Sequence, residues 1–346
     1  MQSNDMQNAL ANLRPLRVPL TKVATIAQTA CSLVRFAGDC LLNSSPTSSL
    51  PQRMPVRHSD GWRIEAPAKL NLGLRIFPRR PDGFHDIESW FVPLALTDSL
   101  TITEDPTLRI SLTDAPADVD TSPQHNLVGR AAALLAQAGG IAPNCHIHLH
   151  KRIPTGGGLG GGSSDAAATL VALNQAWRLH LPTDDLRSLA SQLGSDVPFF
   201  ISSASAICRG RGELLTPLPR TNPLFAVLYL PPQGVATKAV YEQFDTMPPP
   251  AKNHVPFAAI ANAGALEIAQ HIQNDLAPAA YAVAPWLGEL QQRLQQATGT
   301  PVHLSGSGST LFSLFDHHED ALKLAATLTP KMQASCVIQC TTIINN

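Results

Sequence analysis

The stretch IPTGGGLGGGSSDAAATL, residues 153–170, decides the fold, because six glycines in seven positions lead directly into an alanine-rich apolar segment. Glycine tolerates positive φ and carries no Cβ, so successive backbone N–H groups can close around an anion. Ser163 and Ser164 resemble the N-cap region of a helix whose first amides and positive dipole end would face the same anion. The stretch therefore predicts a phosphate-binding loop followed by a helix.

Three alternatives for this glycine loop are distinguished by the residues on either side of it. A P-loop needs a lysine and a Ser or Thr after its last glycine, and no lysine is present there. The dinucleotide pattern GxGxxG is met at Gly156, Gly158 and Gly161, but any glycine run satisfies it, and another helix pattern comes next instead of a strand ending in an acidic residue. A flexible linker is disfavoured because an apolar strand and an amphipathic helix flank the loop.

The overall composition describes an enzyme-sized chain. It has 346 residues, of which 44% are hydrophobic and 15% charged, enough for two domains with a sizeable core. A net charge of -1 and a pI of about 6.9 give no electrostatic basis for binding nucleic acid or an anionic membrane. Six scattered cysteines form no zinc-type pair and no dense disulfide pattern, so a cytoplasmic location is expected.

Residues 1–56 differ from the rest of the chain. They contain two acids, Asp5 and Asp39, and end in the Ser- and Pro-rich segment 44–51. A long uninterrupted apolar span is missing, so a secretory signal is disfavoured. Two explanations stay open: a start assigned too early, with Met54 as the initiator, which is favoured, or an organelle transit peptide. In both cases we expect disorder here, and a chain beginning at Met54 should fold and turn over normally.

The first strand pattern, residues 62–77, places Lys69 and Asn71 on one face. An exposed strand lysine is the simpler alternative. After a Pro-Asp-Gly turn, Phe84 and His85 begin another apolar strand, where a lone Phe-His pair is usually a packing pair.

Residues 100–121 alternate as a strand pair with acidic turns, and residues 125–140 predict an amphipathic helix capped by Asn126 and ended by two glycines. The next strand carries three histidines on one face, His146, His148 and His150. They could bind a metal, but without a neighbouring carboxylate a solvated or partner-covered face is favoured.

Asp196 follows a predicted helix, residues 183–194, that has its N-cap at Thr183 and ends at Gly194. It precedes Pro198 and an apolar segment expected to form a strand. Such an aspartate could simply close the turn. Near a lysine and a bound phosphate, it would be a candidate catalytic base.

The last third alternates apolar strands with helices. Residues 225–230 predict a strand, and residues 237–245 and the segment from 274 predict helices. Residues 302–312 predict a strand, a small-residue loop at 305–309, and then a strand or helix. That loop would let another backbone approach closely.

Six motifs occur in a specific order along the chain: APAKLNLGL (66–74), RRPDGFH (79–85), KRIPTGGGLGGGSSDAAA (151–168), GSDVPFF (194–200), NDLAP (274–278) and LSGSGSTLF (304–312). From about residue 61 to its end, the chain resembles the superfamily of galactokinase, homoserine, mevalonate and phosphomevalonate kinases. Within that superfamily it resembles the family that phosphorylates 4-diphosphocytidyl-2-C-methyl-D-erythritol. The glycine loop alone would not distinguish among these families.

The resemblance implies an α+β, two-domain small-molecule kinase fold, with an ATP-binding domain at 57–220, a second domain at 221–346 and the active site in the cleft between them. It implies transfer of the γ-phosphate of ATP, carried with Mg²⁺, to the 2-hydroxyl of the cytidyl substrate in non-mevalonate isoprenoid synthesis. The partner is then a small molecule, without nucleic acid or membrane, and the protein a monomer or homodimer. The alternatives are a homoserine- or mevalonate-type kinase, disfavoured by the DGFH segment, and a non-catalytic nucleotide-binding relative.

Matched by position, the resemblance assigns Asp196 as the base and Lys69 as the cation beside it, which argues against a non-catalytic relative. A lysine there can keep the aspartate ionised and offset charge on the transferred phosphoryl group. Asn71 would orient the substrate. Cytosine would be bound by three side chains, Phe84, His85 and Tyr241, through stacking on the two aromatic rings and a hydrogen bond from the imidazole.

The resemblance also assigns the nucleotide site. Asn126 and Lys151 are expected near the adenosine. The ATP phosphates would be held along the glycine loop by Pro154, Gly156, Gly157, Gly158, Leu159, Gly160, Gly161, Gly162, Ser163 and Ser164. Two positions depart from the usual pattern. Phe84 stands where tyrosine is more common, and the loop lacks a glutamate for magnesium, so no protein metal ligand is assigned beyond a serine hydroxyl.

Overall fold

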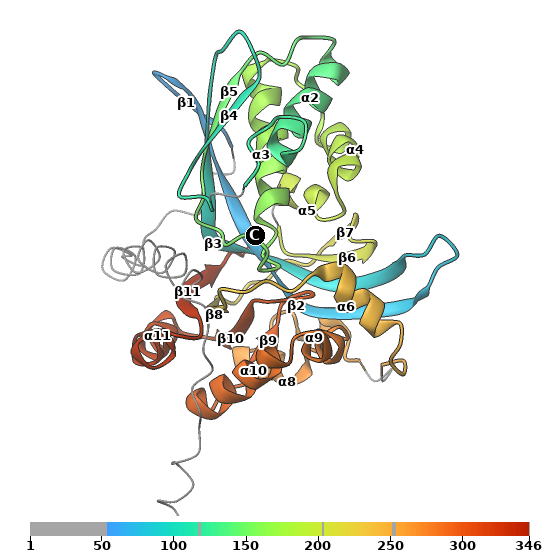
Figure 1. The fold of residues 1–346 in the computed structure, drawn as a ribbon, viewed down its shortest axis with the longest axis vertical. Helices are drawn as coiled ribbons and strands as arrows, with labels where there is room; N and C mark the ends of the chain where they lie inside the picture. Colours follow the sequence, from blue (N-terminus) through green and yellow to red (C-terminus); the bar gives the residue numbers. More distant parts are fainter. Residues whose placement is uncertain (1–53, 117–118, 203, 251–253, 346) are drawn as a thin grey trace, which may run out of the picture. The chain divides into compact units, whose positions relative to one another are not determined.

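The computed structural model describes residues 54–116, 119–202, 204–250 and 254–345, which belong to one compact unit, Ser49–Asn346 (Figure 1). The expectations for residues 1–53 lie outside the described residues, whereas Val56 already pairs with Arg63 in the first strand. Among the described residues, no helix combines the length and apolar character needed to cross a membrane.

A first group of strands is built around one long antiparallel hairpin. Its strands are β1 (Val56–His58), β2 (Gly61–Arg79), β3 (His85–Thr103), β4 (Arg109–Thr113), β5 (His146–His150), β6 (Ala206–Gly210) and β7 (Leu214–Pro217). The predicted strands at 62–77 and from His85 are confirmed as β2 and β3. The predicted strand pair within 100–121 is wrong in its pairing, because β5 lies between β3 and β4, antiparallel to one and parallel to the other.

A second group of strands continues the same sheet. It contains β8 (Leu224–Leu230), β9 (His303–Leu304), β10 (Leu311–Phe315) and β11 (Val337–Ile343). Their order is β11-β8-β10-β9, and β11 joins β3 through the pair Ile343 and Leu94. The predicted strand at 225–230 is confirmed, and the segment after the small-residue loop is a strand. The division into domains at residue 220 stays a prediction.

The helices accompany the two groups of strands. They are α2 (Leu127–Gly139), α3 (Gly161–Ala176), α4 (Thr183–Leu193), α5 (Val197–Ser202), α6 (Thr237–Phe244), α7 (Phe257–Ile260), α8 (Ala265–His271), α9 (Ala277–Val283), α10 (Pro285–Thr298) and α11 (His318–Met332). The predicted helices at 237–245 and after residue 274 are confirmed as α6 and α9.

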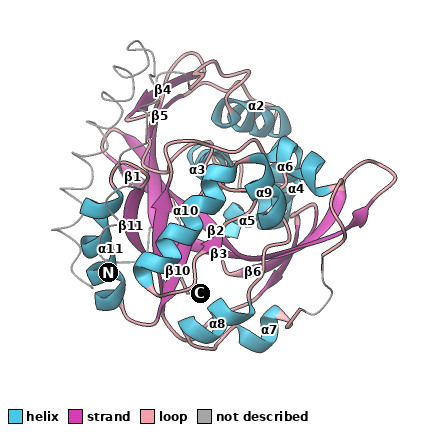
Figure 2. Ribbon diagram, turned by 60° about the horizontal axis from the view of Figure 1, so that its bottom comes forward, coloured by secondary structure: helices cyan, strands magenta, loops and turns pink. Residues whose placement is uncertain are grey.

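The turn end of the β2–β3 hairpin extends past the helices in both views (Figures 1 and 2).

Local sequence explains where the helices begin. The predicted cap of α2 is confirmed, since Asn126 Oδ1 accepts from the N–H of Val128 at 3.0 Å. Helix α3 begins at Gly161, two residues before Ser163. Its N-cap is Gly160, whose left-handed backbone (φ 72) suits glycine. Helix α4 similarly has Pro182 as its N-cap, one residue before Thr183.

The expected strand after Asp196 is wrong, because Val197–Ser202 forms helix α5. Proline in a first helical turn needs no hydrogen-bond donor, so Pro198 permits a helix start here. The four residues Val197 to Phe200 are all buried. Alternating burial, which a one-sided strand would show, is therefore absent from this described segment.

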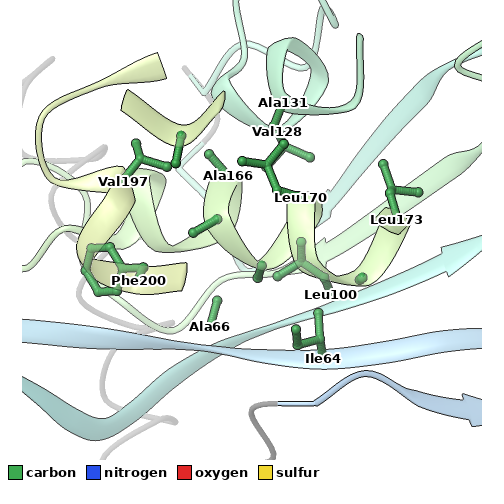
Figure 3. Packing of buried hydrophobic residues seen from close by; sticks show 14 of the residues in the cluster. Ile64, Ala66, Leu100, Val128, Ala131, Ala166, Leu170, Leu173, Val197 and Phe200 are labelled. Carbon is green, nitrogen blue, oxygen red and sulfur yellow. The ribbon is translucent and has the colours of Figure 1, made fainter. Parts of the chain in front are cut away.

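One hydrophobic core cluster packs α3 against the sheet (Figure 3). Ile64 and Leu100 of the strands face Ala166 and Leu170 of α3, and Val128 of α2 completes the contact. Small alanine side chains let the helix lie close to the strands. Burying a leucine contributes about 1.5–3 kcal/mol, so Leu170 helps to hold α3 on the sheet.

Strand β2 passes through three separate hydrophobic clusters along its length. Its buried residues Ile64 and Ala66 belong to the first cluster, Ala68, Leu70 and Leu72 to the second, and Leu74 and Ile76 to the third. Because each cluster contains different helices, the middle of β2 is held from several sides.

Candidate active site

Lys69 and Asn71 lie side by side in the middle of β2, as the alternation predicts. Lys69 Nζ donates to Asn71 Oδ1 at 2.5 Å and lies 4.7 Å from the centre of the Phe91 ring. The β2–β3 register is irregular just before Lys69 and just after Asn71, and such bulges redirect side chains. Lys69 is only 4% exposed, so it is not a solvated strand lysine.

Asp196 reaches Lys69 from the segment between α4 and α5. Its Oδ2 lies 3.6 Å from Lys69 Nζ, and its side chain is 31% exposed while the lysine is buried. The aspartate thus has a cation on the protein side and access from solvent, as a general base for a small-molecule hydroxyl requires.

Two serines fix Asn71. Asn71 Nδ2 donates to Ser89 Oγ at 2.9 Å, and that hydroxyl donates to the carbonyl of Gly73 at 2.7 Å. The backbone N–H of Asn71 donates to Ser305 Oγ at 3.1 Å. Ser305 belongs to the predicted small-residue loop, so this loop is tied to β2 next to the catalytic candidates.

The glycine loop and the small-residue loop lie against each other, which confirms the predicted close backbone approach. The N–H of Thr310 donates to the carbonyl of Gly157 at 3.2 Å. Gly158 has φ 76, and a Cβ there would lie 3.0 Å from the carbonyl oxygen of Gly308. Only glycine meets both conditions without strain.

The other side of the glycine loop contacts β2 directly. The backbone N–H of Lys69 donates to the carbonyl of Leu159 at 2.9 Å. A Cβ on Gly160 would lie 3.1 Å from Lys69 Cγ and 2.8 Å from the ring of Phe200. The loop is therefore held between the lysine strand and the small-residue loop.

A cavity of about 330 Å³ opens beside the glycine loop. Its lining consists of Leu127, Lys151, Ile153, Pro154, Thr155, Gly156, Gly157, Gly158, Leu159, Gly160, Gly161, Gly162 and Ser163. Nearly all residues predicted to hold the ATP phosphates thus lie along one cavity, whose volume is within the range of small-molecule sites. Ser164 is buried in the first turn of α3, and its hydroxyl finds no hydrogen-bond partner among the described residues.

Lys151 is buried between two carboxylates instead of extending into solvent. Its Nζ donates to Asp165 Oδ2 at 2.8 Å and also to Asp98 Oδ2. Burial lowers the pKa of Lys151, but the charges of Asp165 and Asp98 outweigh it, so the pKa is raised. Burial and the charge of Asp98 raise the pKa of Asp165. This Asp98–Lys151–Asp165 triad connects β3, the segment before the glycine loop and α3.

Both ends of the Asn126 amide are used within its own loop. In addition to capping α2, Asn126 Nδ2 donates to the carbonyl of Asp120 at 2.8 Å. The next residue, Leu127, lines the cavity. Asn126 therefore shapes the edge of the cavity through the start of α2.

Phe84 and His85 lie at the turn end of the β2–β3 hairpin. Phe84 is 48% exposed, and the guanidinium carbon of Arg211 lies 4.0 Å from the centre of its ring. His85 packs at 5.8 Å between ring centres against Tyr241 of α6. Burial, followed by the charge of Asp196, raises the pKa of Tyr241 to about 12, so its hydroxyl stays neutral.

The ring nitrogens of His85 are both engaged by the protein. Nδ1 lies 2.8 Å from the carbonyl oxygen of Phe77, and Nε2 lies 2.8 Å from Asp245 Oδ1. Asp245 also pairs with Arg79 at 3.2 Å. This aspartate joins the end of α6 to both strands of the hairpin, and it holds the imidazole that the sequence assigns to the cytosine edge.

Comparison with known proteins identifies the family. The chain is 41% identical over 263 residues to the 4-diphosphocytidyl-2-C-methyl-D-erythritol kinase of Pelotomaculum thermopropionicum, covering 75% of this chain and 91% of that protein. It is 38% identical over 279 residues to the enzyme of the same name from Thermobifida fusca, covering 77% and 90%. The chain belongs to the 4-diphosphocytidyl-2-C-methyl-D-erythritol kinase family.

Domain and structure comparisons agree with this family. Residues 126–204 match the N-terminal domain of GHMP kinases, and residues 256–333 match their C-terminal domain. A crystal structure of 4-(cytidine 5'-diphospho)-2C-methyl-D-erythritol kinase superposes with a TM-score of 0.68 at 35% identity, over 82% of this chain and 100% of that one. A homoserine kinase from Cytophaga hutchinsonii, 20% identical, shares the fold with a TM-score of 0.63, over 84% and 96% of the two chains. The predicted α+β kinase fold is confirmed.

The three histidines of β5 contact polar side chains of β4 and of the residue that follows it. His146 and His148 contact Ser111 Oγ at 2.8 and 2.9 Å, and His150 contacts Asp114 at 2.8 Å. Within the described ranges, no group of three or more His, Cys, Asp or Glu side chains has an arrangement that could hold a metal ion.

Several side chains of this kinase site escape the sequence reasoning. Asp98 had a usable signal, since a carboxylate inside an apolar strand must find a partner when buried. Asp165 and Asp245 lie next to recognisable motifs, but their partners are distant along the chain. Arg211 lies in a turn that no motif marks.

Proposed function

We propose that this protein transfers the γ-phosphoryl group of ATP to the 2-hydroxyl of 4-(cytidine 5'-diphospho)-2-C-methyl-D-erythritol. One observation carries the proposal: the Lys69–Asp196 pair, at 3.6 Å, lies directly against the glycine loop. A base for the acceptor hydroxyl and a cradle for the donor phosphates are therefore adjacent. In-line transfer needs this juxtaposition, because phosphoryl transfer depends on positioning and charge stabilisation.

Asp196 takes the proton of the acceptor hydroxyl. Its Oδ2 faces Lys69, and the partly exposed carboxylate leaves an oxygen accessible to substrate. The buried Lys69 adds positive charge where the phosphoryl group moves. Asn71, held by Ser89 and hydrogen-bonded to Lys69, fixes the direction of the ammonium.

The donor phosphates are held by backbone N–H groups of the glycine loop and by the start of α3. These groups are oriented before any ligand arrives, because β2 and the small-residue loop clamp the glycine loop. Preorganised amides and a helix N-terminus stabilise phosphate charge without reorganisation.

Mg²⁺ would accompany ATP at this site, and the residues present fit it modestly. The buried Ser164 hydroxyl lacks a partner in the described structure and is one side chain suited to a hard cation beside the loop. When bound, the ion neutralises charge on the phosphate oxygens. The ATP phosphates and water would supply its remaining ligands.

The base of the acceptor would stack on Phe84, with Tyr241 supplying the second aromatic surface. Asp245 fixes His85 beside Tyr241, and so His85 would form the wall of the base site. The half-exposed Phe84 ring offers a flat surface on which a base can stack. The scattered cysteines support a cytoplasmic setting for this chemistry.

A coupled ATPase assay with three acceptors tests the proposal. The cytidyl-diphospho-methylerythritol should support turnover, while homoserine and mevalonate should not. The Asp196→Asn variant is the matched control, since it retains the loop but loses the base. Equal turnover with homoserine or mevalonate would overturn the assigned acceptor.

A further inference from the structure

Arg211 lies in the tight turn between β6 and β7. Gly210 and Gly212 flank it at φ 69 and 124, and its backbone N–H donates to Glu213 Oε2 at 2.7 Å. Its guanidinium extends over the exposed ring of Phe84, 4.0 Å from Cζ to the ring centre. The turn therefore places a cation directly on the ring assigned to the acceptor's base.

The other cations near the acceptor site already have carboxylate partners. Lys69 pairs with Asp196, and the arginines pair as Arg79 with Asp245, Arg80 with Asp82 and Asp86, and Arg209 with Glu88. In the described part of the chain, no carboxylate lies within ion-pair distance of the Arg211 guanidinium. Its charge is available to an anionic ligand.

The same turn reaches toward the catalytic aspartate. A Cβ on Gly212 would lie 3.4 Å from the carbonyl oxygen of Ser195 and 3.6 Å from Asp196 Oδ1. One residue of the turn therefore contacts the phosphoryl-transfer end, and its neighbour contacts Phe84 at the base end.

The acceptor's covalent order makes this position informative. Its base, ribose, diphosphate and methylerythritol are linked in that order, so a base on Phe84 and a hydroxyl at Asp196 put the diphosphate between them. The Arg211 turn spans the same interval. A guanidinium matches phosphate oxygens with two parallel hydrogen bonds.

We propose that Arg211 binds the diphosphate of the acceptor and thereby selects a nucleoside-diphosphate ester over an unphosphorylated nucleoside. This inference rests on the proposed function. When the acceptor binds, its base takes the place of the guanidinium on the face of the Phe84 ring. The guanidinium then moves to the phosphates. The exchange is favourable because an exposed cation–aromatic contact is weak compared with charge-assisted bonds to phosphate.

Titration calorimetry with cytidine and with cytidine diphosphate tests the inference, with a non-hydrolysable ATP analogue saturating the donor site. Wild-type protein should bind the diphosphate more tightly. Arg211→Gln should weaken diphosphate binding by about 10- to 100-fold, the range for losing a hydrogen-bonded charge, and change cytidine binding less than about 3-fold. Arg211→Lys should keep part of the preference.

Arg57→Gln is the matched control, because Arg57 also lies over an aromatic ring, that of Trp62 at 5.7 Å. It should leave both ligands unaffected. Equal loss of cytidine and diphosphate binding in Arg211→Gln would overturn the inference and give Arg211 only a role in shaping the Phe84 site. Unchanged diphosphate binding would also overturn it. Wild-type protein that binds neither ligand would overturn the assigned acceptor itself, and the role of Arg211 with it.

Discussion

The two ends of the proposed site are built in opposite ways. At the donor end, the glycine loop presents backbone groups and is clamped between Lys69 and the small-residue loop. At the acceptor end, the hairpin presents side chains, and Phe84 is about half exposed. Phosphate is the same on every nucleotide and can be bound by backbone, whereas distinguishing one acceptor from another requires side chains.

Loss of the base should have the largest effect, because Asp196 stands where the two ends meet. Asp196→Asn should lower kcat by about 10²–10⁴-fold, the usual scale for general-base catalysis, while ATP affinity barely changes. Steady-state kinetics together with calorimetric ATP binding would measure both. Near-normal turnover would show that the hydroxyl needs no base, and Asp196 would then not link the donor end to the acceptor end.

Truncating the acceptor ring tests the hairpin end alone. Phe84→Ala should raise KM for the cytidyl substrate by about 5- to 150-fold, corresponding to about 1–3 kcal/mol for one stacked base, and leave KM for ATP nearly constant. Phe77→Ala is a suitable control, because Phe77 is a similarly exposed phenylalanine of the same hairpin. Equal weakening toward both substrates would mean that the two ends are not independent.

A methyl group in the glycine loop tests the donor end. Gly158→Ala combines positive φ with a close backbone contact, whereas Gly156→Ala has positive φ but open space around its Cβ. The left-handed conformation costs about 1–2 kcal/mol in a residue with a side chain. KM for ATP should therefore rise about 5- to 30-fold in Gly156→Ala and more in Gly158→Ala. Similar values for both would argue against clamping by the small-residue loop.

The buried Asp98–Lys151–Asp165 triad should make the stability of the protein depend on pH. Burial and the charge of Asp98 raise the pKa of Asp165 to about 8 in the folded chain, so the folded state holds a proton that the unfolded state releases. The stability from this group is present at low pH and declines as pH rises from about 4 toward about 8. Asp165→Asn removes the titration and should flatten the decline.

Thermal melts of wild type and Asp165→Asn between pH 5 and 9 would measure this smallest effect. A change of about 1 kcal/mol in unfolding free energy shifts Tm by about 2–4 °C in a mid-sized domain. Between pH 5 and 9, the Tm of the wild type should therefore fall by at least about 2–4 °C more than the Tm of Asp165→Asn. Asp184→Asn, which changes an exposed aspartate of α4, is the control. If Tm depends on pH in the same way in wild type and Asp165→Asn, Asp165 does not hold the extra proton in the folded state.

Local pattern predicted much of this molecule, and long-range pairing accounts for what it missed. Alternation placed Lys69 beside Asn71, and capping chemistry placed the start of α2. Helix α5 was missed because a short apolar run containing proline fits a strand as well as a helix. The partners of Lys151 and His85 were missed because Asp98 and Asp245 come from distant elements, which local periodicity does not connect.

Because β2 passes through three hydrophobic clusters, it limits both how the chain can unfold locally and which positions can change in sequence. A shift of its register by one residue would move the side chains of all three clusters to the opposite face of the sheet, so the backbone around Lys69 should exchange its amide hydrogens only when the whole unit unfolds. The turn at Asp82 and Gly83 is exposed, and its amides should exchange through local fraying. Substitutions can then accumulate at the hairpin tip, and with them new acceptors, without displacing the Lys69–Asp196 pair proposed for phosphoryl transfer.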